Sequence, residues 1–197
     1  MGSILSTLGL FFLMCFIPFI SNKVERKVPY IEEKVSFKNK EVTLKGTFIM
    51  PVVGEKPFPT VIITHGSGFA TRWWGMYWAS ELSKIGIATL IYDKRGCGES
   101  KGAEWYNSSL DDLSADVVSA MKFLEQYSSV DKNKIGIYAV SQGCWVAGRV
   151  SNMNKNLAFI IANSGGGVKP SEEEIFSYDI NLKCIHKKME SGFERRK

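Results

Sequence analysis

The chain has 197 residues with 45% hydrophobic and 23% charged side chains, a composition typical of one globular domain with a buried core. The net charge of +5 is spread along the chain, and no basic run is interleaved with aromatic residues, which argues against a nucleic-acid partner. Four widely separated cysteines and two histidines give neither metal-ligand spacing nor a disulfide framework. We therefore expect no metal and no other cofactor.

The first 22 residues form a segment of their own. Residues 8–20 carry no charged side chain, and a basic cluster at residues 23–27 follows them. Thirteen apolar residues suit the core of a cleaved signal peptide, whereas the longer stretch from residue 4 to residue 20 suits an uncleaved membrane anchor. The sequence leaves both alternatives open, and both predict an exported or membrane-anchored protein.

After this segment, short apolar runs alternate with helical patterns. The expected strands cover residues 34–37, 42–50, 60–64, 87–92, 135–139 and 157–162, and the expected helices cover 74–85, 142–151 and a segment that begins near residue 108. The last of these helices has two candidate capping boxes, Ser108 with Asp111 and Ser109 with Asp112. The alternation predicts an α/β fold, a mostly parallel sheet with helices on both faces. Such sheets bind ligands at the carboxyl ends of their strands.

The first polar motif, His65-Gly66-Ser67-Gly68, directly follows the expected strand at 60–64. Glycines at this point allow a tight turn that directs backbone N–H groups into a cleft. Such donors stabilise the oxyanion that develops during acyl transfer. His65 taken alone favours a plain structural role, since a lone histidine at a strand end is often structural.

The second motif, residues 93–100 (DKRGCGES), follows the expected strand at 87–92. Neither a full dinucleotide fingerprint nor a Walker lysine pattern is present, so phosphate binding has little support. We interpret the motif as a glycine-rich loop held by buried charge pairs, with Asp93 and Arg95 as one candidate pair. The loop is then a scaffold beside a cleft.

The third motif, residues 139–143 (AVSQG), fits the pattern G-x-S-x-G with alanine in the first place. A serine on a sharp strand-to-helix turn needs small neighbours two positions away, because the two backbones pack closely there. We therefore predict that Ser141 is a catalytic nucleophile and that Gly143 is a structural glycine, as are Gly66 and Gly68. The N–H groups of Gln142 and Ser67 are the predicted oxyanion donors.

These three motifs, in this order and spacing, resemble the α/β-hydrolase superfamily. They look most like bacterial exported serine hydrolases related to serine aminopeptidases and prolyl-oligopeptidase-type domains. The resemblance covers roughly residues 33–170. It implies an α/β-hydrolase fold with an eight-stranded sheet, a nucleophile at Ser141, no metal, and small-molecule or peptide substrates with ester, thioester or amide bonds.

The C-terminal part departs from the family's pattern. In this fold the acid and the histidine follow the serine. His186 is the only histidine after Ser141, and it lies in a charged helical pattern that is typical of a surface helix. Asp179, Glu190 and Glu194 are no better placed as the acid.

We therefore expect a partial hydrolase core at residues 23–170, followed by the start of a helical cap at 171–197, with the last two strands missing. Losing triad members leaves only about 10³- to 10⁴-fold catalysis over water, from the oxyanion hole and binding. Two alternatives to a truncated serine hydrolase stay open. One is a non-catalytic binding module that keeps the hydrolase cleft. The other is a two-chain enzyme in which a partner chain supplies the missing strands, acid and histidine.

Overall fold

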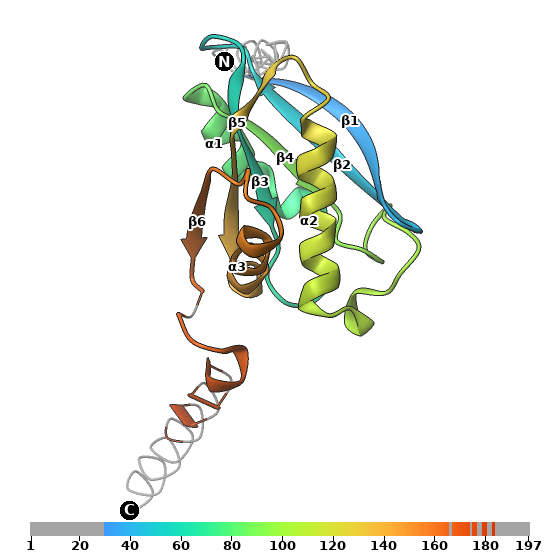
Figure 1. The fold of residues 1–197 in the computed structure, drawn as a ribbon, viewed down its shortest axis with the longest axis vertical. Helices are drawn as coiled ribbons and strands as arrows, with labels where there is room; N and C mark the ends of the chain where they lie inside the picture. Colours follow the sequence, from blue (N-terminus) through green and yellow to red (C-terminus); the bar gives the residue numbers. More distant parts are fainter. Residues whose placement is uncertain (1–29, 166, 174, 177–178, 181–182, 184–197) are drawn as a thin grey trace, which may run out of the picture.

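The computed structural model describes residues 30–165, 167–173, 175–176, 179–180 and 183 (Figure 1). The expected signal peptide or anchor at residues 1–22 and most of the expected cap lie outside these residues, so both stay predictions. The strands are β1 (Tyr30–Asn39), β2 (Val42–Pro51), β3 (Phe58–Thr64), β4 (Ala88–Tyr92), β5 (Val130–Val140) and β6 (Phe159–Asn163). The helices are α1 (Met76–Lys84), α2 (Leu110–Leu124) and α3 (Gln142–Met153), with short 3₁₀ turns η1 (Arg72–Gly75) and η2 (Trp105–Asn107).

Within the described residues the strands form one six-stranded sheet in the order β1-β2-β4-β3-β5-β6. β1 and β2 form an antiparallel hairpin, and β2 pairs antiparallel with β4. The remaining neighbours, β4-β3, β3-β5 and β5-β6, are parallel. The mostly parallel sheet predicted from the alternation of strands and helices is confirmed.

Helices cover both faces of the sheet, as the sequence predicts (Figure 1). Side chains of a strand point alternately to its two faces, so the buried run of β3 feeds two separate cores. Val61 and Ile63 pack with α1 on one face, whereas Ile62 packs with α2 and α3 on the other. Each such fully buried aliphatic side chain contributes about 1.5–3 kcal/mol relative to exposure. These two cores fix the strand ends that carry the polar motifs.

The start of α2 uses the second of the two candidate capping boxes. The Asp112 N–H donates to Ser109 Oγ (3.1 Å), and the Ser109 N–H donates to Asp112 Oδ2 (2.9 Å). The Ser108 hydroxyl instead donates to the carbonyl of Glu104 (2.8 Å). This cap places the first turn of α2 beside the carboxyl ends of the strands.

In the described part of the chain β6 is an edge strand that pairs with β5 alone. Its apolar side chains Phe159, Ile160 and Ile161 remain 36%, 39% and 42% exposed. The expected strand at 157–162 is present, and its position at the edge leaves apolar side chains in contact with solvent.

Candidate active site

The three polar motifs meet at one edge of the sheet. β3 lies between β4 and β5, and all three run parallel, so the loops that follow them leave from the same edge. The resulting cleft is the position that parallel α/β sheets offer to ligands.

Ser141 occupies the sharp turn between β5 and α3. Its backbone has φ 50° and ψ −119°, a conformation that costs a non-glycine residue about 1–3 kcal/mol. Two hydrogen bonds fix this turn. The Ser141 N–H donates to the carbonyl of Asn163 (3.0 Å), and the Ser141 carbonyl accepts from the Cys144 N–H (2.9 Å). The turn therefore has the geometry of a nucleophile elbow.

The small residues around Ser141 are required by close packing. A β-carbon on Gly143 would lie 2.5 Å from Thr64 Oγ1 and 3.0 Å from the His65 carbonyl oxygen, so only glycine lets α3 approach the end of β3. Ala139, two residues before the serine, is fully buried. The structure thus gives the spacing of the third motif its physical reason.

The glycine-rich loop after β3 faces the serine. A β-carbon on Gly66 would lie 3.4 Å from the Ser141 β-carbon, which shows how near the loop backbone comes to the elbow. Gly68 has φ +87°, a conformation that other residues rarely adopt. Ser67 and Gln142 line the same pocket as Ser141. As the first residue of α3, Gln142 has a backbone N–H without an acceptor inside the helix.

His65 ties the base of this loop to β4. Its Nε2 lies 2.6 Å from the Tyr92 carbonyl oxygen, and because a carbonyl only accepts, Nε2–H is the donor. Burial, with a smaller contribution from the charge of Lys94, lowers the pKa of His65 to about 4, so the ring is neutral near pH 7. The structural role expected for a lone histidine at this strand end fits the contact.

The loop after β4 is held by two buried ion pairs, and they differ from the candidate pair. Asp93 pairs with Arg72 of η1 (Nη2 to Oδ2, 2.7 Å), and Arg95 pairs with Asp116 of α2 (Nε to Oδ2, 2.8 Å). Burial opposes ionisation of Asp93, but the hydrogen bonds and charge of Arg72 outweigh it and hold the pKa of this carboxyl below its usual range. The suggested Asp93–Arg95 pair is therefore wrong, because the two side chains enter different helical layers.

Lys94 lies between these two pairs and is a site residue that the motif does not predict. Its Nζ donates to the carbonyl oxygens of Gly66 (2.7 Å) and Gly68 (3.1 Å) and to Gln142 Oε1 (3.2 Å). Burial lowers its pKa. A lone lysine in a motif that resembled a scaffold gave no sequence signal for these contacts.

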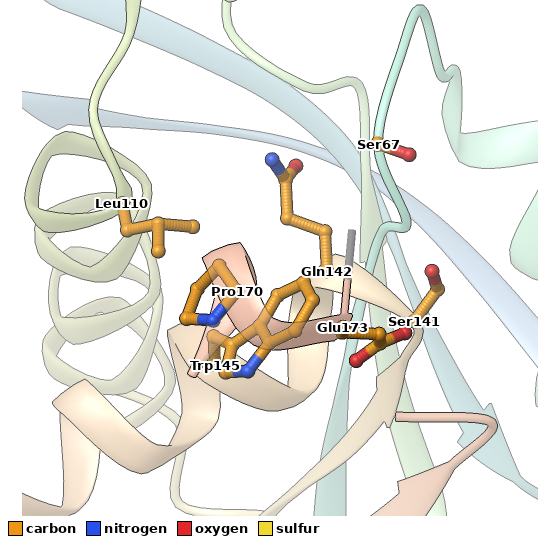
Figure 2. A pocket seen from close by; sticks show the side chains of 7 residues that line it. All are labelled: Ser67, Leu110, Ser141, Gln142, Trp145, Pro170 and Glu173. Atoms are coloured by element: carbon orange, nitrogen blue, oxygen red, sulfur yellow. The ribbon is translucent and has the colours of Figure 1, made fainter. Parts of the chain in front are cut away.

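The pocket at the elbow has a volume of about 480 Å³. Figure 2 shows Ser67, Gln142, Ser141 and Glu173 among the side chains around it. Leu110, Trp145 and Pro170 form an apolar wall. Trp145 lies four residues after Ser141 on α3, so helical spacing could have placed it on the same side of the helix.

Of the residues considered for the acid and the histidine, the structure describes only Asp179. His186, Glu190 and Glu194 lie outside the described residues. Asp179 is exposed and accepts from Lys183 Nζ (2.6 Å), one helical turn further on.

Within the described ranges, no helix is long and apolar enough to cross a membrane.

A strained serine between strand and helix, facing a glycine loop at the edge of a mostly parallel sheet, defines an α/β hydrolase fold. Solved structures share this architecture. The α/β hydrolase GrgF from Penicillium sp. sh18 superposes with a TM-score of 0.62 at 18% identity, over 82% of this chain and 56% of that one. An esterase from Pyrococcus furiosus, Pf2001, gives a TM-score of 0.59 at 25% identity, over 74% and 53%.

The chain belongs to the serine aminopeptidase S33 family, whose model matches residues 55–192. The thiohydrolase aneE of Aspergillus aculeatus is 30% identical over 111 residues, which are 56% of this chain and 35% of that protein. The chain spans about a third of the length of the curated relatives it matches, and about half of the length of the two solved structures named above. The membership confirms the resemblance of the three motifs to the α/β-hydrolase superfamily and to serine aminopeptidases.

Proposed function

We propose that this protein is a serine hydrolase that cleaves ester, thioester or amide bonds through an acyl-enzyme on Ser141. The proposal rests on the strained backbone conformation of Ser141, which has φ 50° and ψ −119° at the junction of β5 and α3. A strained conformation persists only where the surrounding structure enforces it, and such strain is concentrated at functional sites. Here it presents the serine to a pocket of about 480 Å³.

In the proposed reaction, Ser141 Oγ attacks the carbonyl carbon of the substrate, and the carbonyl oxygen takes up the negative charge. The N–H groups of Ser67 and Gln142 stabilise this oxyanion, supported by the positive end of α3. Collapse of the intermediate expels an alcohol, thiol or amine and leaves the acyl group on Ser141. Water then hydrolyses the acyl-enzyme to a carboxylic acid. The names of the relatives, a thiohydrolase and an esterase, support thioester and ester substrates.

The proton of Ser141 must pass to a general base. Among the described residues no histidine lines the pocket, and His65 already donates through Nε2 to the carbonyl of Tyr92. This observation favours a second candidate function, a binding module that keeps the cleft without the chemistry. A base supplied by His186, or by a partner chain that adds further strands, would make the assembly a working hydrolase.

Labelling of the full chain with a fluorophosphonate probe tests the proposal, because such probes react only with an activated serine. We expect labelling of the native chain and none of Ser141→Ala. Ser67→Ala is the matched control, since it removes a hydroxyl from the same pocket but keeps the backbone N–H. A folded native chain that resists the probe would refute a hydrolase that works as this chain alone and would favour the binding module. If it is labelled, loss of labelling in His186→Ala would identify the base.

A further inference from the structure

Lys94 is a buried cation whose hydrogen bonds all go to uncharged oxygens. Its side chain belongs to a residue that is only 4% exposed, and Nζ has three acceptors, the carbonyls of Gly66 and Gly68 and Gln142 Oε1. An ammonium group has three protons to donate, so the three acceptors use its full capacity. Burying a charge is costly unless hydrogen bonds compensate. The loop after β3 and the start of α3 supply that compensation together.

The contact with Gly66 fixes the direction of one predicted oxyanion donor. A peptide group is planar and trans, so the carbonyl of Gly66 and the N–H of Ser67 point in opposite directions. With the Gly66 carbonyl bound to Lys94 at 2.7 Å, the Ser67 N–H is turned away from the lysine. The Gly68 carbonyl, bound at 3.1 Å, sets the next peptide but one in the same manner. A loop with two glycines has few side-chain contacts of its own to hold these orientations.

The contact with Gln142 ties the same ammonium group to the other predicted donor. Gln142 follows Ser141 directly, and its side-chain oxygen lies 3.2 Å from Lys94 Nζ. One side chain therefore bridges the two elements that would form the oxyanion hole. Its positive charge also favours negative charge in the nearby cleft.

We infer that Lys94 is a positioning residue of the oxyanion hole, which holds the Ser67 N–H and the Gln142 N–H in a fixed relation to Ser141. This inference rests on the proposed hydrolase function. Lys94 is not among the residues that line the pocket at Ser141, and it acts through the loop. Removal of a direct oxyanion donor lowers kcat roughly 10²- to 10³-fold. Misplacing the donors by loss of Lys94 should cost less, about 10- to 100-fold, with KM little changed.

The test compares two variants of similar side-chain length. Lys94→Met removes all three N–H donors of the ammonium group, whereas Lys94→Gln supplies two N–H donors from its amide. The readouts on the full chain are the rate of fluorophosphonate labelling at Ser141 per folded molecule and hydrogen exchange of the loop at residues 65–71. We expect about 10- to 100-fold slower labelling and faster loop exchange in Lys94→Met, with partial recovery of both in Lys94→Gln.

Two controls separate positioning from a general loss of stability. Lys101→Met removes another lysine that donates to a glycine carbonyl (Gly98, 3.4 Å), but from an exposed position. Val130→Ala weakens the core at the far end of β5 from Ser141. Lys101→Met should match the native chain in both readouts, and Val130→Ala should lower Tm without slowing labelling.

The outcomes distinguish the inference from the proposed function. Labelling at the native rate in Lys94→Met, or slow labelling with unchanged loop exchange, would overturn the positioning role. If the native chain is not labelled at all, the proposed function fails. In that case faster hydrogen exchange of the loop in Lys94→Met and Lys94→Gln would still support the role of Lys94 in holding the loop. Unchanged exchange in both variants would refute that role.

Discussion

Acidification from pH 7 to pH 4 is expected to destabilise this fold through His65. The imidazole is buried at 7% exposure, and its Nε2–H donates to the carbonyl of Tyr92 at 2.6 Å. Its pKa is lowered from 6.5 to about 4 in total. Desolvation is the largest cause and the charge of Lys94 adds to it, whereas the carbonyl of Tyr92 and the charge of Asp93 oppose the shift. The folded state therefore keeps a neutral ring over a pH range in which the unfolded chain binds a proton.

The sign and size of the effect follow from this difference in pKa. Because the folded pKa lies below the unfolded value, the stabilisation by neutral His65 is complete above pH 6.5 and is lost as the pH falls toward 4. Each pKa unit corresponds to about 1.4 kcal/mol, so a gap of roughly 2.5 units amounts to about 3 kcal/mol. That is a large share of the roughly 5–15 kcal/mol that stabilises a typical domain.

Urea unfolding of the full chain at a series of pH values measures the effect, with His65→Gln as the comparison. Glutamine keeps an N–H that can donate to the Tyr92 carbonyl but does not titrate. Carboxylates such as Asp93 contribute to acid unfolding in both chains, so the difference between the two profiles isolates the histidine. The free energy of unfolding of the native chain should fall by about 3 kcal/mol more than that of His65→Gln between pH 7 and pH 4. Parallel profiles would refute the reasoning.

Two further predictions concern packing and charge near the elbow. Gly143→Ala should destabilise by about 1–3 kcal/mol in urea unfolding, because its β-carbon meets Thr64 Oγ1 at 2.5 Å. Gly148→Ala on the same helix, with nothing within 4 Å, should be neutral or stabilising; equal costs at both positions would contradict the packing argument. Arg95→Met should cost about 3–5 kcal/mol by leaving the buried carboxylate of Asp116 unpaired, and the double variant with Asp116→Leu should recover most of it. Additive losses in that double-mutant cycle would exclude coupling between the two residues.

The parts of the fold that the sequence predicts are those under local constraint. Short apolar runs rich in β-branched side chains, such as residues 60–64 and 87–92, are typical of strands that are buried on both faces of a sheet. The elbow could equally be predicted from the sequence. A serine on a tight strand-to-helix turn requires small residues two positions before and after it, and here these are Ala139 and Gly143. In both cases the residues that predict the structure belong to the same short segment as the structure itself.

The ion pairs of the loop after β4 could not be predicted in this way. Asp93 and Arg95 are near neighbours in sequence, yet each finds its partner 21 residues away, in Arg72 and Asp116 respectively. η1 leads into α1 on one face of the sheet, whereas α2 covers the other, so the pairing depends on which layer each helix joins. Only the assembled sheet supplies that information.

The place of Lys94 follows from these two pairs. With Asp93 bound to η1 and Arg95 bound to α2, the backbone of the residue between them has little freedom, and its side chain is directed to the loop after β3 and to Gln142. Replacing a buried ion pair by apolar residues often leaves stability unchanged or raises it. In this loop the two pairs hold the backbone on either side of Lys94. In this loop Asp93 and Arg95 thus act as a scaffold, whereas Lys94 between them belongs to the candidate active site.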